Sequence, residues 1–523
     1  MELTILICFA AYTALLFLVM WLTNRRGAKG NEAFFRAGRR SPWPVVAYGM
    51  IGASLSGVTF MSVPGGVYNG QWTYMPMVLG YVLGYATIAL VLLPLYYRLN
   101  LTSIYSYLGQ RFGARSEKTG ASFFILSRLL GSALRMYLVV FVLYEFVFRA
   151  WGIPFWVPAL VFIVIILLYT FRGGIKTVVW TDMLQTTFLL LAAIATVLAI
   201  LSNLDLSISD LLKTSSQHGY TRIFETNPSA PKFYWKQIIA GMFITITMTG
   251  LDQDMMQKNL TCRTLRDAQK NVMTSSLLFI LVNIIFLMLG AALLTYSDIT
   301  GFPLPVNDAG TVVPDKIFPS IAFSLSTFTA VCFVLGMVAA GYSSADGTLT
   351  ALTTTFCYNF LGFGKEKESK VGSTTAAKKT NAKNDSNVPP TPPSLPHHPP
   401  LTPIAIRRIV HVAFALLYLL IIIAFRPFHN QSLIDTVFDV AGFTYGPLLG
   451  LYAYGLFTRR PARDSWVPLI ALLSPVLCYI LKLFSPSWFG YHFGFEILLL
   501  NGLITMLLLW LSSLTVKHQT PTK

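Results

Sequence analysis

Residues 327–358 form a long apolar segment whose centre is rich in oxygen-bearing side chains. The stretch at 341–348 reads GYSSADGT, so Ser343, Ser344 and Asp346 fall within two turns of a predicted membrane helix. A charged group at the bilayer centre costs ~2.5–3.5 kcal/mol on insertion scales, and such residues usually have a function. Hydroxyl, carboxylate and carbonyl oxygens are the ligands that a hard cation such as Na+ prefers. The segment therefore predicts ion-coupled transport.

A second carboxylate lies in the stretch WTDMLQ. This residue, Asp182, is about 10 Å into its apolar segment at ~1.5 Å per helical residue. That depth favours a role in an ion pathway. Arg172 and Lys176 are near enough in the sequence for a surface ion pair, which is the alternative interpretation.

Two arginines, Arg128 and Arg135, are seven residues apart in another apolar segment and therefore share one face of a predicted helix. Arg128 can extend its side chain to the cytoplasmic surface. Arg135 is near the centre of the segment, where its guanidinium needs a carboxylate partner. That carboxylate could belong to a substrate, or it could be Asp182 or Asp346.

The elements that must position these side chains are membrane helices. The chain is 54% hydrophobic and 12% charged, whereas a soluble domain carries about 25% charged residues. Thirteen apolar stretches are long enough to cross ~30 Å of hydrocarbon. They are 2–22, 43–64, 72–97, 119–148, 152–171, 175–201, 235–257, 271–297, 327–358, 405–425, 434–457, 465–485 and 492–515. We therefore predict an all-α integral membrane protein with about 13 transmembrane helices.

The net charge of +17 does not indicate nucleic-acid binding, because the basic residues gather in alternate connections. Those connections are 23–42, 98–118, 258–270 (which includes Lys258) and 459–463. Basic connections face the cytoplasm in membrane proteins. The pattern predicts a multi-pass protein of the plasma (inner) membrane, with the N-terminus external and the C-terminus cytoplasmic.

Residues 361–404 differ from the rest of the chain. They are rich in lysine and then in proline, ending in VPPTPPSLPHHPP. Such a composition cannot form a packed core, so we expect a disordered cytoplasmic linker. The 202–234 and 298–326 connections are expected to be external and to hold short surface helices.

Two of the predicted spans contain breaks. GASLSG at 52–57 interrupts the span at 43–64, and TITMTG at 245–250 interrupts the span at 235–257. The two spans are five apart and run in opposite directions. Paired breaks of this kind are typical of inverted-repeat transporters with a binding site at the bilayer midplane.

Several longer motifs occur in an order that resembles the sodium:solute symporter family. They are FFRAGRRSPWP, GASLSGVTFMSVPGGVY, RGGIKTVVWTDMLQ, LDQDMMQKNLTCRTLRDAQ and AAGYSSADGTLTALT. The resemblance implies a LeuT-like fold of 5+5 inverted repeats, with one extra N-terminal helix and further C-terminal helices. The segments would be 1–42 (first helix and basic loop), 43–201 (first repeat), 202–234 (external loop), 235–457 (second repeat, containing the linker) and 458–523 (two helices and tail).

The resemblance also implies a sodium site, with Na+ as the coupling ion. Its ligands would be backbone carbonyls of the broken first core helix and two hydroxyls of the eighth. The matching positions are Gly52, Leu55, Ala340, Ser343 and Ser344. Some family members hold a second cation on the aspartate that matches Asp182 and on hydroxyls one turn beyond the serine pair. In this chain those last positions are Asp346 and Gly347, so two carboxylates could hold a cation, share a proton or pair with Arg135.

The stretch SLSGVTFMS resembles the bacterial branch of the family that transports sialic acid. The solute-binding positions implied by that resemblance are Ser54, Ser56, Thr59, Arg135 and Phe243, while Val78 stands where that branch has a glutamine. The aromatic residues Trp72 and Tyr74 could stack on a sugar ring or simply mark the membrane boundary.

Sodium-coupled uptake of a small organic solute, in the class of sialic acid or another carboxylated sugar, is thus the leading expectation. The partners would be a small-molecule solute, a sodium ion and the lipid bilayer, with no nucleic acid, and no motif indicates an enzyme. The alternatives are a symporter for a neutral sugar or another metabolite, and a non-transporting sensor with a transporter-like membrane domain.

Overall fold

A computed structural model describes residues 2–25, 31–228, 230, 232–307, 309–363, 402–426, 433–491 and 493–514 of the chain. The described part consists of helices, connections and three isolated bridges. The long helices are α1 (Glu2–Arg25), α9 (Ala114–Leu143), α10 (Trp156–Gly173), α11 (Ile175–Asn203), α15 (Leu265–Thr300), α17 (Thr327–Thr355), α19 (Pro403–Ala424), α20 (Leu433–Phe457), α21 (Val467–Phe489) and α22 (Ile497–Leu514). The expected all-helical class is confirmed.

Each of the thirteen predicted ranges contains helix. Within the described residues, nine helices are long and apolar enough to cross a membrane, or ten if one bent pair counts as a single span. Among the others, α10 has only Trp156–Phe171 as its apolar part, which is shorter than the helices that qualify. Thirteen spans therefore remain a prediction.

The predicted break in the first core span is present. Helix α3 (Trp43–Ser54) and helix α4 (Gly57–Gly65) meet at an angle of 63°. Leu55 and Ser56 between them have extended backbone. Ser56 then starts α4 as an N-cap, in a reciprocal capping box with Thr59, which satisfies amide groups at the new helix start. The serine at position 56 thus explains why a helix can begin again inside an apolar segment.

The second predicted break is also present, in a different form. Helix α13 (Tyr234–Thr245) widens into the π-helical turn η5 (Ile246–Gly250) and is followed by α14 (Gln253–Asn259). Asp252 caps α14 by accepting from the Met255 amide at 3.1 Å. A π-helical turn often marks a functional position in a helix, and this one faces the first break across the centre of the bundle.

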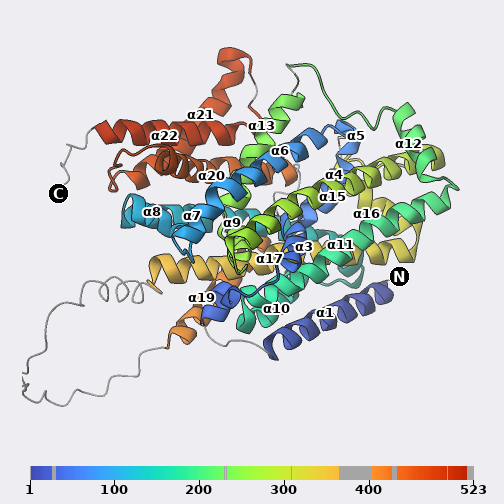
Figure 1. Ribbon diagram of the computed structural model, residues 1–523. Helices are drawn as coiled ribbons and strands as arrows, with labels where there is room; N and C mark the ends of the chain where they lie inside the picture. The colour runs from blue at the N-terminus through green and yellow to red at the C-terminus, as the bar shows by residue number, and fades with distance from the viewer. Residues whose placement is uncertain are drawn as a thin grey trace, which may run out of the picture.

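The centre of the bundle is built by α11, α17, α3 and α9. Helix α11 packs on both α17 and α3, and α9 packs on α17 and α20. Figure 1 shows α1 at one edge of the bundle and α21 and α22 at the opposite edge. Helix α6 (Met75–Thr87) lies against α13. Both breaks therefore lie inside the bundle.

The two connections expected to be external do hold helices. They are α12 (Ile208–Gln217) and α16 (Pro314–Leu325). Most of the predicted linker at 361–404, including the proline-rich stretch, lies outside the described residues.

Candidate functional site

The break between α3 and α4 leaves two carbonyl groups without their usual helical donors. In a continuous α-helix the amide of residue i bonds the carbonyl of residue i−4. The Ser56 amide, which would bond the Gly52 carbonyl, donates instead to Thr59 Oγ1 at 3.4 Å. The Thr59 amide, which would bond the Leu55 carbonyl, donates to Ser56 Oγ at 3.3 Å. The carbonyls of Gly52 and Leu55 are therefore available to another ligand.

Helix α17 packs against α3 and α4 and contributes hydroxyl groups. Ser343 and Ser344 are both buried, and within the described residues Ser344 Oγ has no hydrogen-bond partner. A buried hydroxyl without a partner costs about 1–3 kcal/mol, so this oxygen offers an open ligand position. Ala340 lies one turn earlier on the same face. The predicted sodium ligands thus belong to two helices that are in contact.

Unlike that of Ser344, the hydroxyl of Ser343 has a hydrogen-bond partner. Ser343 Oγ donates to Asp182 Oδ1, and this bond connects α17 to α11. One of the predicted sodium ligands is therefore in direct contact with the carboxylate that the sequence placed in an ion pathway.

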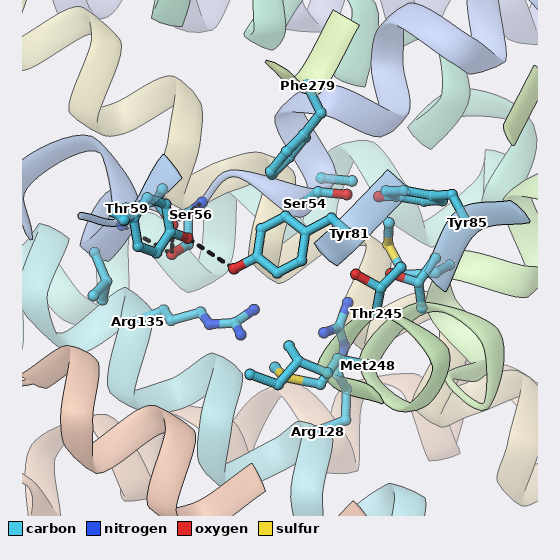
Figure 2. A pocket seen from close by; sticks show the side chains of 16 residues that line it. Ser54, Ser56, Thr59, Tyr81, Tyr85, Arg128, Arg135, Thr245, Met248 and Phe279 are labelled. Carbon is cyan, nitrogen blue, oxygen red and sulfur yellow. Dashed lines mark hydrogen bonds between the residues drawn. The ribbon is translucent and has the colours of Figure 1, made fainter. Parts of the chain in front are cut away.

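A cavity of about 100 Å³ opens beside the break. Four of the five predicted solute-binding residues line it, namely Ser54, Ser56, Thr59 and Arg135, whereas Phe243 is not among the lining residues. Val78 is buried and does not reach it either. Figure 2 shows these side chains around the cavity, with the Arg135 guanidinium extending towards the tip of Tyr81.

The cavity also has walls that the sequence analysis missed. They include Tyr81, Tyr85, Arg128, Thr245, Met248, Thr249 and Phe279. The two tyrosines had a recognisable signal, because positions 74, 81 and 85 repeat at helical spacing on one side of α6. Of the two aromatic residues considered earlier, Tyr74 lines this cavity and Trp72 does not.

Arg135 makes no ion pair with any residue that the structure describes, and its Nε has no hydrogen-bond partner there. Neither suggested internal partner is available to it. Asp182 is ion-paired with Lys258, whose Nζ lies 2.9 Å from Asp182 Oδ2. Asp346 Oδ2 accepts from the Tyr169 hydroxyl at 2.8 Å and from Thr181 at 3.3 Å. Arg135 therefore pairs with neither carboxylate, and the suggested internal ion pair is wrong.

Arg128 differs from its predicted position as well. Instead of extending to the cytoplasm, it is 5% exposed and donates to Asp254, and its Nε lies 3.5 Å from Asp252 Oδ2. The reason is that α14 brings two carboxylates against α9 at this level. The shared helix face of Arg128 and Arg135 was predicted correctly, but only Arg135 is left for a ligand.

Lys258 requires the largest correction. The sequence analysis assigned it to a basic cytoplasmic connection, yet it lies in α14 and is 1% exposed. Its Nζ also lies 3.4 Å from Asp254 Oδ1, one turn away. Lys176, one of the two surface partners considered for Asp182, donates its Nζ to the Thr23 carbonyl instead. The signal that could have found Lys258 is its i,i+4 spacing from Asp254.

A larger cavity of about 420 Å³ lies next to the first. Both cavities are lined by Tyr74, whose hydroxyl shares a hydrogen bond of 2.8 Å with that of Tyr81. The walls of the larger cavity include Lys232, Lys236 and Lys482; Lys232 lies within the predicted external loop, and Lys236 follows it. The tyrosine pair therefore separates an outer, lysine-bearing cavity from the inner one.

Known proteins match this chain over most of its length. A model of the sodium:solute symporter family matches residues 34–369. The sodium/sialic acid symporter NanT of Aliivibrio fischeri is 26% identical over 90% of this chain and 86% of its own length. The sodium/sialic acid symporter SiaT of Proteus mirabilis is 26% identical over 68% of this chain and 69% of its own.

A solved structure shares the fold. The substrate-bound, outward-open state of a Na+-coupled sialic acid symporter superposes with a TM-score of 0.77, covers 98% of both chains and is 21% identical. That likeness identifies the LeuT-like architecture expected from the motifs.

Proposed function

Because the chain belongs to the sodium:solute symporter family, we propose that the solute it carries with Na+ is an organic acid, in the class of sialic acid or another carboxylated sugar. The chain is a sodium-coupled secondary active symporter of the membrane. Downhill movement of Na+ drives solute uptake as the site opens alternately to the two sides. The identity of the solute is the part proposed here.

One observation carries the proposal: the Arg135 guanidinium lines the cavity and has no carboxylate partner in the described structure. A guanidinium in a low-dielectric site needs an anion, and its planar fork fits a carboxylate through two parallel hydrogen bonds. Ser54, Ser56 and Thr59 line the same cavity, and their hydroxyls suit the polar groups of a sugar acid. The two sialic acid symporters that resemble this chain support the same solute class.

We propose the carbonyl oxygens of Gly52, Leu55 and Ala340 and the hydroxyls of Ser343 and Ser344 as the Na+ ligands. The carbonyls released at the helix break and the unpartnered Ser344 hydroxyl support this assignment. Sodium would then bind at the carbonyls released by the break, and the solute in the cavity that Ser54 and Ser56 line. An orientation with the N-terminus external and the C-terminus cytoplasmic, in the plasma (inner) membrane, follows from the basic connections.

A short carboxylate is the second candidate, and the size of the cavity favours it. Pockets for drug-sized ligands typically have volumes of ~300–1,000 Å³, whereas this cavity has about 100 Å³. A sialic acid is larger than this, so it would need a wider form of the cavity. A short monocarboxylate would fit the cavity as it stands and would use the same arginine.

The test is a counterflow screen of the purified, full-length protein in liposomes. The solutes are sialic acid, other sugar acids, short monocarboxylates, neutral hexoses and amino acids, each with a Na+ gradient and with choline in its place. We expect Na+-dependent exchange of an acid and none of the matching neutral sugar. Exchange of a neutral hexose in preference to every acid would contradict the proposal, and equal exchange in choline would contradict the sodium coupling.

A further inference from the structure

Four carboxylates and two cationic side chains are buried together beside the inner cavity. The carboxylates are Asp182, Asp252, Asp254 and Asp346, and the cations are Arg128 and Lys258; none of the six is more than 5% exposed. Arg128 forms ion pairs with Asp252 and Asp254, and Lys258 forms a further ion pair with Asp254. The position of the Lys258 ammonium decides what Asp182 can bind.

Both oxygens of Asp182 already have partners. Oδ2 lies 2.9 Å from the ammonium of Lys258, and Oδ1 accepts from the hydroxyl of Ser343. A metal ion at Asp182 would have to displace a positive charge that is covalently attached to α14. The ammonium stands where a cation bound to this carboxylate would be.

Asp346, the other carboxylate expected to hold a second cation, is surrounded by hydrogen-bond donors. Its Oδ2 accepts from Tyr169 at 2.8 Å, Thr181 at 3.3 Å and Gln185 at 3.5 Å, and its Oδ1 accepts from the Gly347 amide at 2.6 Å. A second cation at Asp346 would have to displace these hydrogen bonds, which already engage both carboxylate oxygens. The residues present therefore do not fit a second bound cation.

Gly347 gives independent support for the place of the ammonium. A Cβ atom at this position would lie 2.9 Å from Lys258 Nζ and 2.4 Å from Asp254 Oδ1. A serine or threonine one turn beyond the serine pair would therefore collide with the ion pair. The missing side chain at 347 and the lysine at 258 occupy one space, so the two residue types are structurally linked.

We propose that the Lys258 ammonium is a tethered counter-cation of Asp182, which takes the place of a second bound cation and leaves the chain with a single Na+ per transport cycle. The inference rests on the proposed Na+ site at Ser343 and Ser344, because that site supplies the single ion. It adds a specific function to Lys258: the residue sets the ion stoichiometry.

The experiment counts Na+ sites on the purified full-length protein with radioactive sodium as the only probe, so no solute is needed. The wild type should bind one Na+ with a Hill coefficient of unity. Lys258→Met keeps the length of the side chain and removes its charge, so Asp182 should recruit a second Na+ and the number of Na+ bound at saturation should rise from one to two. Lys258→Met combined with Asp182→Asn removes both charges and should return the count to one.

The control is Lys213→Met, which removes a lysine that is 72% exposed on α12, and should leave the count at one. Two Na+ in the wild type, or one Na+ in a folded Lys258→Met protein, would overturn the inference while leaving sodium coupling intact. No Na+ binding in the wild type would instead contradict the proposed sodium site. If Lys258→Met does not fold, the inference is tested by the number of Na+ bound to the wild type and to Lys258→Arg. Lys258→Arg keeps the positive charge and should bind one Na+, and two Na+ on either protein would overturn the inference.

Discussion

The amide of Gly52 donates to Thr186 Oγ1 at 3.0 Å, and this bond fixes the end of α3 to α11. Thr186 Oγ1 donates in turn to the Asp182 carbonyl at 2.7 Å. One threonine therefore links a proposed sodium ligand to the residue that holds the Lys258 ammonium. A change at this contact should alter Na+ binding before it alters the solute cavity.

Gly52→Ala tests that contact. The new methyl group would lie 2.3 Å from Thr186 Oγ1, so α3 or the Thr186 side chain must shift, and either change disturbs the contact that holds the end of α3. We expect Na+ affinity to fall about tenfold, which corresponds to ~1.4 kcal/mol, as measured by the Na+ concentration for half-maximal uptake. Gly131→Ala in α9 is the matched control, since nothing lies within 4 Å of a Cβ there. An unchanged Na+ requirement in Gly52→Ala would argue against the carbonyl as a ligand.

The serine pair gives the most direct test of sodium coupling. Ser343→Ala and Ser344→Ala should each weaken Na+ binding, and the double substitution should abolish Na+-driven uptake without loss of membrane insertion. Thr350→Ala is the control on the same helix, because that buried hydroxyl also lacks a hydrogen-bond partner among the described residues and its removal should be neutral. Uptake by the double variant that still follows the Na+ gradient would exclude the site.

Arg135→Lys separates a solute-binding role from a structural one. Lysine keeps the charge and loses the planar fork, so the half-saturating solute concentration should rise by about tenfold or more, the effect of losing one good charge-assisted contact. Na+ binding measured without solute should change little. Because neither Asp182 nor Asp346 pairs with Arg135, adding Asp346→Asn to Arg135→Ala should rescue neither expression nor Na+ binding. Recovery in that double variant would restore the internal pair and count against an acidic solute.

Arg128 should behave in the opposite way to Arg135. Arg128→Met removes the counter-charge of Asp252 and one of the two counter-charges of Asp254. An unpaired buried charge costs about 3–5 kcal/mol of folding free energy. The thermal melting temperature in detergent should therefore fall clearly. The control is Arg149→Met, since Arg149 is 63% exposed beside Glu145 and an exposed pair contributes about 0–1 kcal/mol. Equal melting temperatures for the two variants would show that the buried network does not stabilise the fold.

Replacement of residues 366–400 by a short Gly/Ser linker should preserve most of the uptake activity. Their composition cannot form a packed core, and these residues lie outside the described structure. The comparison is made at equal amounts of correctly inserted protein. Lost uptake under that condition would assign a gating or regulatory role to the segment.

Much of this architecture was predictable from the sequence, because each feature depends on residues close together in the chain. Long apolar runs required membrane helices, and the stretches at 52–57 and 245–250 marked both breaks. The hydroxyl pair at Ser343 and Ser344 followed from polar residues in an apolar helix. The cost of placing polar groups in hydrocarbon makes such local signals strong.

The pairing of charges was decided only by the tertiary structure. Helical periodicity placed Arg128 and Arg135 on one face, but which of them meets a carboxylate depends on where the start of α14 places Asp252 and Asp254. Lys258 looked like part of a basic connection because the sequence after it is basic, and its burial depends on Asp182 in another helix and on the missing side chain at Gly347. A hydrophobic pattern determines which face of a helix is buried. It does not determine which neighbour covers that face, because the neighbour is chosen by packing between segments far apart in the chain.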